Sequence, residues 1–430
     1  MACTSFGGKT GAVRPTGPVG RTAACVSGCS HPHDPENRFG SARPAPPENP
    51  ADHALDAGGP PARHPDPSRK AGGDRCRSRP GGYDRAMESF DPDRYSRQTR
   101  FAPLGTVGQT RLAGSRVVVV GCGALGGVSA LALARAGVGS LRLIDRDLPE
   151  VSNLPRQMLF DEADVAEGLP KAVAATRHLV RINSALHCEA VVSDLTAERV
   201  DALLGGCDLV VDGTDNFETR FIINEYCCRE GLPWIHGGAI GAEGRVLTVV
   251  PGRTACLRCL VPDPPVPGSL PTCDTTGIIG PAALVVGAVQ AAEAMKVLAL
   301  GTQSVGHRLL ACDLWEGTWR TVDLSSLAAT GCPTCRGRDF PWLEGRIGGR
   351  AAVLCGRDAV HVPAVVGGID LHALSGRLAT VGPVTTNAWL VRAEVEPGIR
   401  LSVFADGRAI VFGTRDEARA RAVVARYVGT

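Results

Sequence analysis

Residues 117–126 read VVVVGCGALG, an apolar run of strand length that leads directly into three closely spaced glycines. In a βα turn of this kind, Gly121 permits the tight turn, Gly123 lets the backbone approach a phosphate, and Gly126 lets the helix pack on the strand. Free N–H groups at the start of the helix add positive potential. The stretch therefore predicts a phosphate-binding turn in an α/β fold.

A second apolar run, LRLIDRD, brings Asp145 to roughly the distance at which an acidic residue binds ribose hydroxyls. A dehydrogenase would show the same two features. Further along, Arg156 lies in SNLPRQ and Lys171 begins a predicted helix. A triphosphate carries about four negative charges, and a protein that binds it needs cations such as these to balance them. An enzyme that transfers a hydride does not need an Arg and a Lys at this place. The pair favours ATP, although either residue alone could be a solvated surface charge.

The chain of 430 residues divides into three parts. Residues 1–86 are rich in Pro, Gly and Arg and predict a disordered leader, either a tail or the result of too early a start codon. A targeting peptide is the alternative, but the segment lacks the apolar region that a signal peptide needs. Residues 87–338 alternate strands and helices, which predicts a doubly wound α/β sheet, and residues 339–430 predict a small α+β domain.

The predicted strands of the larger domain are 117–120, 141–144, 187–192, 209–212, 234–237 and 245–250. Its predicted helices are 125–136, 171–183, 197–204 and 219–230. The smaller domain is predicted to hold strands 351–354, 389–393, 401–404 and 409–412, a turn at Asp406 and Gly407, and a helix over 416–427.

A polar cluster, TDN, follows the predicted strand that ends at Asp212. In open α/β sheets ligands lie at this carboxyl edge. Asp215 could hold Mg²⁺ on the phosphates or orient an attacking carboxylate, and Asn216 could bind the nucleotide. The alternative is that one of them caps the following helix.

Two Cys-x-x-Cys pairs lie far apart in the sequence, at Cys256 and Cys259 and at Cys332 and Cys335. Four thiolates form the closed tetrahedral ligand set of a structural Zn²⁺, which leaves no open position for catalysis. A redox dithiol is the alternative, but it needs only one pair. The spacing therefore predicts a structural zinc site.

Bulk properties exclude several classes of protein. A net charge of +2 over 430 residues gives no electrostatic reason to expect nucleic acid. The apolar stretch around 278–300 is interrupted by Gln290, Glu293 and Lys296, which argues against a membrane span. Sixteen cysteines in a large chain without a signal peptide are typical of reduced thiols, so we expect a cytoplasmic protein. Three of these cysteines are predicted to lie in the core: Cys122, Cys227 and Cys228.

The ordered set RYSRQ (94–98), GCGALG, IDRD, SNLPRQ, Lys171, TDN and the paired cysteines resembles the MoeB/ThiF/HesA family of adenylating enzymes, relatives of the ubiquitin-activating E1 enzymes. The resemblance covers about residues 94–337 and implies a Rossmann-like E1/ThiF adenylation fold that uses ATP, Mg²⁺ and Zn²⁺. It implies that Asp145 binds the ribose and that Asp215 is the essential Mg²⁺-linked aspartate. Arg97 matches an arginine that reaches the ATP site of a partner subunit, which implies a homodimer.

The resemblance places further residues at the nucleotide: Gly121, Gly123, Ala124, Gly126, Asp147, Ser152, Asn153, Arg156, Lys171 and Asn216. Two positions depart from the family pattern, because Ala124 stands where Gly is common and Pro155 replaces a Gln and so removes a donor. Cys273 falls on what the family would call the crossover loop. In ThiF-like relatives a cysteine there can form a covalent link to the carrier, whereas in some MoeB-like relatives it is dispensable, and a buried structural thiol is the alternative.

The resemblance implies ATP-dependent adenylation of the C-terminal glycine of a ubiquitin-like sulfur-carrier protein with a Gly-Gly terminus. Pyrophosphate is released, and a separate sulfur donor then forms the thiocarboxylate. Arg97, Arg156, Lys171 and Mg²⁺ at Asp215 would neutralise the phosphates, and the attacking carboxylate, already ionised, needs no general base. Sulfurtransferase activity is not expected of the C-terminal domain, because Cys355 is followed by Gly-Arg-Asp in a strand setting.

Other functions remain as alternatives at this point. Adenylation of a peptide terminus or a tRNA base is the nearest, and an NAD-dependent oxidoreductase belongs to a different class. A non-catalytic scaffold would have lost at least one of the four predicted catalytic residues, and all four are present: Arg97, Arg156, Lys171 and Asp215. The sequence does not distinguish molybdopterin, thiamine, cysteine or tRNA-thiolation pathways.

Overall fold

The computed structural model describes residues 90–265, 273–328, 331–347, 358–363 and 368–429, all within the unit Arg79–Thr430. The predicted leader, residues 1–86, lies outside the described residues, as do the predicted strand 351–354 and Cys355.

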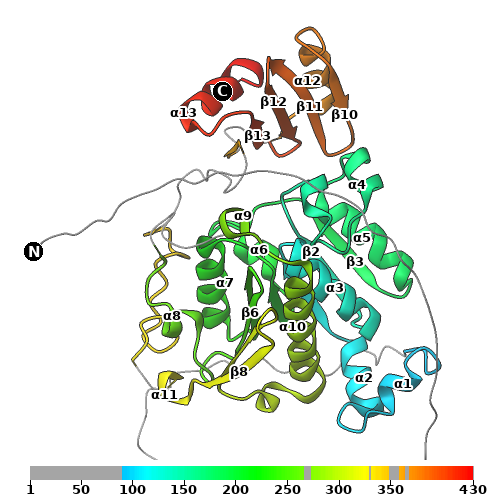
Figure 1. Ribbon diagram of the computed structural model, residues 1–430, viewed down its shortest axis with the longest axis vertical. Coiled ribbons are helices and arrows are strands. Elements are labelled where there is room, and N and C mark those ends of the chain that lie inside the picture. Colours follow the sequence, from blue (N-terminus) through cyan, green and yellow to red (C-terminus); the bar gives the residue numbers. More distant parts are fainter. Residues whose placement is uncertain (1–89, 266–272, 329–330, 348–357, 364–367, 430) are drawn as a thin grey trace, which may run out of the picture. The chain divides into compact units, whose positions relative to one another are not determined.

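A mixed sheet lies at the centre of the part before residue 347 (Figure 1). Its strands are β1 (Arg116–Val120), β2 (Ser140–Ile144), β3 (His187–Val191), β4 (Leu209–Asp212), β5 (Trp234–Ile240), β6 (Glu243–Val249), β7 (Arg308–Asp313) and β8 (Thr318–Asp323). The strand order is β3-β2-β1-β4-β5-β6-β7-β8. The pairs from β3 to β5 are parallel and those from β5 to β8 are antiparallel.

Helices cover both faces of this sheet, which confirms the doubly wound α/β class. Val117 and Val119 of β1 pack among α3 (Ala124–Ala136), α5 (Lys171–Ile182) and α10 (Gly280–Leu300). Val118 and Val120 point to the other face, toward α6 (Val200–Leu204), α7 (Phe217–Glu230) and α8 (Leu257–Leu260). Since both faces are buried, the central strands read as continuous apolar runs.

The remaining elements of this part are short helices: α1 (Ser96–Thr99), α2 (Gly105–Ala113), η1 (Val151–Asn153), α4 (Glu162–Glu167), α9 (Cys273–Thr276), η2 (Thr302–Ser304) and α11 (Ser325–Ala328). The sequence patterns miss β7 and β8. Every residue of β8 is exposed, so this edge strand carries no buried face and no apolar alternation to reveal it.

Helix α10 is, among the described residues, the one helix long and apolar enough by composition to cross a membrane. Its contacts are those of a core helix. Gly287 lies so close to α3 that a Cβ there would be 2.7 Å from the Cβ of Val128. Two of the three polar interruptions are buried and bonded: Gln290 Nε2 donates to the carbonyl of Asp212 at 2.7 Å, and Thr248 Oγ1 donates to Glu293 at 3.2 Å. Lys296 is half-buried and pairs with Glu293.

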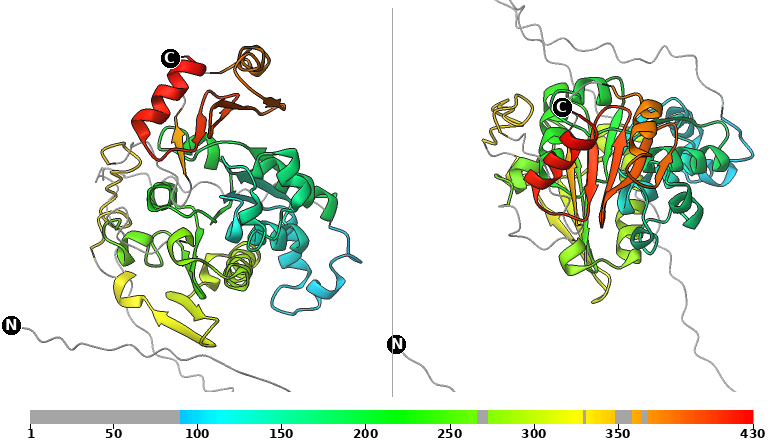
Figure 2. Two further views of the ribbon diagram at one scale, coloured as in Figure 1. Left: turned by 45° about the horizontal axis from the view of Figure 1, so that its top comes forward. Right: turned by 90° about the horizontal axis from the view of Figure 1, so that it is seen from above.

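A second sheet is built from residues after 358 (Figure 2). It holds β9 (Ala359–Val362), β10 (Val384–Thr386), β11 (Leu390–Glu396), β12 (Ile399–Phe404) and β13 (Ala409–Phe412) in the antiparallel order β10-β11-β12-β13-β9. Helices α12 (Leu371–Leu378) and α13 (Glu417–Tyr427) pack on one face around Val391, Leu401 and Val403. The α+β class is confirmed, and β9, β10 and α12 are elements that the sequence patterns did not predict.

Gly121 and Gly126 have the geometry that the sequence predicts for the βα turn. Gly121 has a φ of +83°, and a Cβ there would lie 2.8 Å from the carbonyl oxygen of Gly213. A Cβ on Gly126 would overlap the carbonyl oxygen of Gly121. A Cβ on Gly123 would meet only Gln157, at an ordinary 3.6 Å, so the backbone there is open to a ligand.

Replacing Gly126 with Ala should therefore lower the free energy of unfolding by about 1–3 kcal/mol, because the clash is with backbone that cannot rotate away. Gly376→Ala is the matched control: it is an exposed residue of α12, and a Cβ there would have nothing within 4 Å. Helix propensity should raise stability there by up to about 1 kcal/mol. Urea unfolding followed by circular dichroism compares the two, and equal effects would contradict the packing argument.

Candidate functional site

The carboxylate of Asp145 links the ends of β1 and β2. Its Oδ2 accepts from the backbone N–H of Cys122 in the glycine turn, and its Oδ1 accepts from the N–H of Asp147, both at 2.7 Å. Burial raises the pKa of this carboxyl, and the charge of Lys171 opposes that rise. The predicted ribose ligand thus lies at the predicted phosphate turn.

Lys171 and Asp147 lie beside this carboxylate. Lys171 is only 3% exposed, although it is a lysine at the first position of a helix. Its backbone N–H donates to the carbonyl of Asp147 at 2.8 Å, and its Nζ lies 3.4 Å from Asp147 Oδ2. A buried ammonium at the carboxyl edge of the sheet can balance an anionic ligand. The structure therefore rules out the alternative of a solvated surface charge for Lys171.

Arg146 is a cation that the sequence reasoning missed. Its Nη1 donates to Asp194 Oδ1 at 2.7 Å. Burial acts to lower the pKa of this guanidinium, but the charges of Asp194, Asp147 and Asp215 outweigh burial and raise it. The sequence offered one signal for this residue: it stands between Asp145 and Asp147 in IDRD, two residues that were already predicted to bind the nucleotide.

Asp215 and Asn216, the two candidate residues of TDN, differ in their surroundings. Asn216 is the N-cap of α7, and its Oδ1 accepts from the N–H of Thr219 at 2.9 Å. The capping alternative is therefore correct for this oxygen. Asp215 is exposed, and no described residue donates a hydrogen bond to its carboxylate. It is the side chain that this loop leaves open to a metal or ligand.

A buried network holds this loop from below. Asp212 is fully buried and accepts from His236 Nδ1 at 2.7 Å and from Thr214 Oγ1 at 2.6 Å. Arg220 lies 3.5 Å from Asp212 and donates to the carbonyl of Thr214 at 2.6 Å. Although burial acts to raise it, the pKa of Asp212 is lowered by these partners. Burial also lowers the pKa of His236, against the effect of Asp212.

Arg220 and His236 were also missed by the sequence reasoning. Arg220 lies one helical turn after Asn216 in DNFETR, which is the spacing of neighbours on a helix face. Nothing local marks His236, because the strand that carries it meets Asp212 only through sheet pairing.

The segment SNLPRQ divides into buried and open residues. Asn153 is buried, and its Oδ1 accepts from the N–H of Glu150 at 3.2 Å, so this side chain shapes the loop. Ser152 is exposed, and Arg156 Nη1 donates to the carbonyl of Ser152 at 2.7 Å. The carbonyl of Pro155 lies against the start of α10, where a Cβ on Gly280 would be 2.5 Å away.

The second sheet contacts the same edge. Arg408 is 3% exposed and stacks on Phe404 with its guanidinium carbon 3.7 Å from the ring centroid. It donates to the carbonyl of Arg146 at 2.9 Å and to that of Val192 at 3.3 Å. A side chain from a separate sheet therefore fixes the backbone of the loop that carries Asp145 and Asp147.

Within its own chain, Arg97 lies near the amino ends of the parallel strands, at the opposite end of the sheet from the candidate site. Its neighbour Gln98 donates to the carbonyl of Ala136, the last residue of α3, at 2.8 Å. Arg94 donates to the carbonyl of Ile182, the last residue of α5, at 2.6 Å. Both helices begin at the candidate site, and the 13 residues of α3 span about 20 Å. Arg97 therefore does not join the other candidate residues.

The four cysteines of the two Cys-x-x-Cys pairs come together. The Sγ distances are 3.7 Å for Cys256 to Cys332, 3.6 Å for Cys259 to Cys335 and 3.8 Å for Cys256 to Cys259. Four sulfurs at about 2.3 Å from one Zn²⁺ would be about 3.8 Å apart, whereas a disulfide would bring two of them to about 2.0 Å. The cluster is compatible with zinc, and all four thiols lie within 4.8 Å of one another.

The remaining cysteine predictions have different outcomes. Cys122, Cys227 and Cys228 are buried, as predicted. Cys273 begins the short helix α9, and its side chain lies outside the described part, so its covalent role stays a prediction.

A glycine-rich phosphate turn, a fixed acidic residue after β2 and a buried lysine at the edge of a doubly wound sheet define a Rossmann-like nucleotide-binding protein. The chain belongs to the ThiF family, whose model matches residues 95–334.

Known proteins agree with this family. The chain is similar to the sulfur carrier protein ThiS adenylyltransferase of Bacillus subtilis, with 43% identity over 338 residues that cover 78% of this chain and 99% of that protein. The SAMP-activating enzyme E1 of Haloferax volcanii is 40% identical over 250 residues, which cover 58% of this chain and 91% of that protein. The crystal structure of E. coli MccB with MccA-N7isoASN matches with a TM-score of 0.50 at 24% identity over 58% of this chain and 76% of that one, which shows the shared fold.

Proposed function

We propose that this chain uses ATP to adenylate the C-terminal glycine of a ubiquitin-like sulfur-carrier protein and releases pyrophosphate. The observation that carries the proposal is the joined set of Asp145, Asp147 and Lys171 at the glycine turn. This set lies in a chain that matches nearly the whole length of a ThiS adenylyltransferase. Because the chain belongs to the ThiF family, adenylation is favoured over the alternative of an NAD-dependent oxidoreductase.

The residues divide the chemistry between them. Asp145 positions the ribose, and Lys171 and Arg156 neutralise the phosphates, so that the carrier's carboxylate can approach the α-phosphate in line. Asp215 suits Mg²⁺, because its carboxylate is exposed and accepts no hydrogen bond from the described residues. A metal held there would add positive charge at the triphosphate. The attacking carboxylate is ionised at neutral pH and needs no base.

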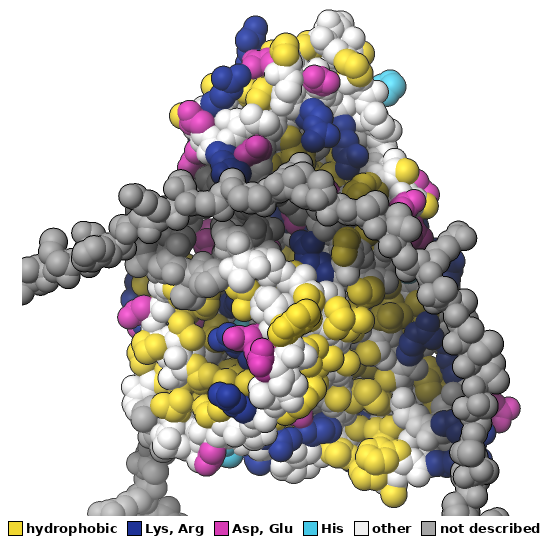
Figure 3. Space-filling view, in the orientation of Figure 1, with side chains coloured by type: hydrophobic (Ala, Val, Ile, Leu, Met, Phe, Trp, Pro, Cys, Tyr) yellow, Lys and Arg dark blue, Asp and Glu magenta, His cyan; other side chains and the backbone are white. Residues whose placement is uncertain are grey.

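A protein substrate fits the surface of this part of the molecule. Apolar side chains gather over the lower part of the face in Figure 3, where α10 and β8 lie. Large apolar side chains that are exposed on the described part of the chain include Leu284, Trp315 and Trp319, the last two 79% and 64% exposed. Contiguous apolar surface of this kind marks contact with another protein. Such surface fits a protein partner, either the carrier or the second subunit proposed below.

Carrier-dependent exchange of pyrophosphate into ATP tests the function. Wild-type protein should catalyse exchange only with a carrier that ends in Gly-Gly. Asp215→Asn should reduce the rate by at least about a hundredfold, because charge stabilisation at the phosphates is lost. Asp208→Asn is the control: it is an exposed aspartate immediately before β4, at the opposite end of the same strand. Absence of exchange with ThiS-like and MoaD-like carriers would reject the function, and normal exchange in Asp215→Asn would reject the assignment of that residue.

A homodimer gives Arg97 its role. Within one chain, α1 lies at the far ends of α3 and α5, about 20 Å along α3 from the glycine turn. Arg97 is exposed, and no described residue pairs with it. An arginine supplied by the partner subunit would complete the phosphate site, as arginine fingers do.

Mixing two inactive variants tests action across the subunits. Arg97→Ala and Asp215→Asn proteins, mixed in equal amounts and exchanged, should recover up to about a quarter of wild-type exchange activity. One site in each heterodimer would then hold both an intact Asp215 and an intact Arg97 from the partner. Differently tagged chains verify that heterodimers form. Verified heterodimers without recovered activity would show that Arg97 acts within its own chain or not at all.

Structural zinc accounts for the cysteine cluster. The sulfurs already have the spacing of a tetrahedral site, and Asn224 supports it by donating from Nδ2 to Cys256 Sγ at 3.7 Å and accepting from Leu257 N–H at 2.9 Å. This support resembles the outer-shell contacts of metal sites. A redox pair would not require all four thiols within contact distance.

Elemental analysis should find about one zinc per chain in the wild-type protein. Cys332→Ser should lower both the zinc content and the melting temperature, since a structural metal contributes folding free energy. Cys188→Ser, a half-buried cysteine outside the cluster, should leave the zinc content unchanged. Metal-free wild-type protein of full stability would reject the zinc site.

A further inference from the structure

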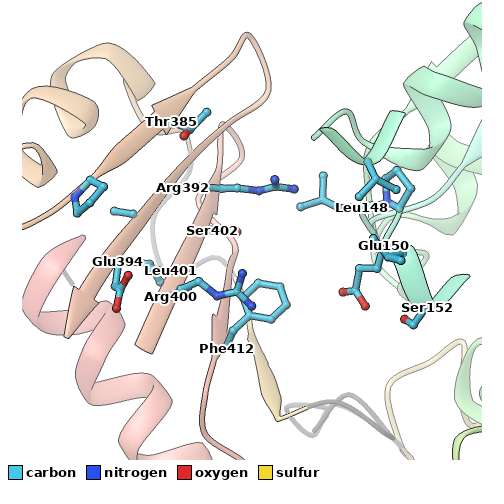
Figure 4. A pocket seen from close by; sticks show the side chains of 15 residues that line it. Leu148, Glu150, Ser152, Thr385, Arg392, Glu394, Arg400, Leu401, Ser402 and Phe412 are labelled. Carbon is cyan, nitrogen blue, oxygen red and sulfur yellow. The ribbon is translucent and has the colours of Figure 1, made fainter. Parts of the chain in front are cut away.

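The second sheet has two unlike faces. One face packs its apolar side chains under α12 and α13. On the other face, Leu390, Phe404 and Ile410 pack against Leu148 of the loop after β2. Beyond this apolar contact the same face becomes polar, and a cavity of about 740 Å³ lies between it and the loop 148–152 (Figure 4). Ligand sites in proteins commonly have volumes of about 300–1,000 Å³.

Two arginines line the sheet side of this cavity. Arg392 on β11 extends across it toward Leu148, and Arg400 on β12 lies beside the ring of Phe412 (Figure 4), 5.3 Å from its centroid. Both alternate with the buried residues of their strands, so the pleat directs them to the same face. The register pairs Arg392 with Ser402 and Arg400 with Glu394 across these strands.

The guanidinium of Arg392 has no directly bonded partner among the described residues, and two carboxylates, Glu150 and Glu394, line the same cavity. Arg392 is half-buried, and its Nη1 lies against Gly168, where a Cβ would be only 2.6 Å away. Among the described residues none forms a hydrogen bond or ion pair with Arg392 or with the guanidinium of Arg400. Burial first, and the charge of Arg400 second, lower the pKa of Arg392, while Glu150 across the cavity opposes them. A half-buried guanidinium without a partner, beside a second one, favours an anionic ligand.

The cavity borders both segments that the proposed function assigns to the phosphates. Ser152 lines its far wall, four residues before Arg156 and bonded to it through the carbonyl. Gly168, against which Arg392 packs, lies three residues before Lys171, and Asn387 of the second sheet donates to the carbonyl of Gly168 at 3.3 Å. An anion in the cavity would therefore lie next to the bound nucleotide.

We propose that Arg392 and Arg400 form a binding site for a pyrophosphoryl group beside the nucleotide. The group is either the β- and γ-phosphates of bound ATP or the pyrophosphate that the reaction releases, since both present the same oxygens to the two arginines. Arginine suits this ligand because its planar guanidinium donates two parallel hydrogen bonds to phosphate oxygens. The inference rests on the proposed function for the identity of the anion, and it gives the second sheet a part in substrate binding.

Titration calorimetry with the full chain and inorganic pyrophosphate, without carrier, measures this site directly. Arg392→Gln should raise the Kd for pyrophosphate by at least about tenfold, and Arg392→Lys by less, because lysine keeps the charge but loses the paired hydrogen bonds. The Kd for AMP should stay unchanged. Arg421→Gln is the matched control, since it removes one exposed arginine of α13 that pairs with Glu417 away from the cavity.

The two sources of the group separate in the same experiment. If the Kd for ATP rises together with that for pyrophosphate, the arginines bind the β- and γ-phosphates of the substrate. If only the Kd for pyrophosphate rises, they bind the released product. Unchanged melting temperatures in both variants show that the sheet still folds.

Several results would overturn the site. These are a Kd for pyrophosphate within twofold of wild type in the Arg392→Gln/Arg400→Gln double variant, an equal loss in Arg421→Gln, or a raised KM for the carrier with pyrophosphate binding unchanged. The last would assign the cavity to the protein substrate. Pyrophosphate binding that depends on Arg392 in a protein without exchange activity would support the site and reject the proposed function. Normal exchange activity in wild-type protein, with pyrophosphate binding that the arginine substitutions leave unaltered, would support the proposed function and reject the site.

Discussion

The carboxyl edge of the larger sheet depends on one buried carboxylate. Asp145 accepts a hydrogen bond from the glycine turn after β1 and another from the loop after β2, and so fixes two backbone segments relative to each other. Hydrogen bonds to a charged group contribute about 1.5–3 kcal/mol each. The same loop then places Asp147 beside Lys171, so the first cation of the site is positioned through the backbone that Asp145 holds. Together with the hydrogen bond from the Gly121 N–H to the carbonyl of Ile144 at 2.8 Å, this carboxylate holds the glycine turn beside the residues that balance its ligand.

Burial separates the roles of two aspartates that lie three residues apart. Asp212 is buried among His236, Arg220 and Thr214, and these partners consume its hydrogen-bonding capacity in holding the loop. Asp215, at the tip of that loop, is exposed and keeps its oxygens for a ligand. A carboxylate that is fully paired stabilises structure, whereas one that is preorganised but unpaired can hold a metal. The buried network around Asp212 holds the loop, so the carboxylate of Asp215 is positioned without forming hydrogen bonds of its own to the described residues.

Two parts of the molecule besides the glycine turn are proposed to contribute to the site. The segment with Arg97 lies at the far ends of α3 and α5, so the role proposed for Arg97 requires a second subunit. The second sheet fixes the loop after β2 through Arg408 and presents Arg392 across a cavity. Both proposed additions supply arginine, whose planar guanidinium can donate two parallel hydrogen bonds to phosphate oxygens.

The sequence alone determined the parts that depend on local spacing. The glycine turn, the strands of the parallel core and the two cysteine pairs follow from residues near one another in the chain, whereas the cap at Asn216 was only the alternative to nucleotide binding. Strand β8 escaped prediction because it has no buried face. Arg146, Arg220, His236 and Arg408 gained their roles only from the tertiary structure. Each acts on backbone or carboxylates that sheet pairing and the docking of a second sheet bring near, and no periodicity along the chain records such contacts.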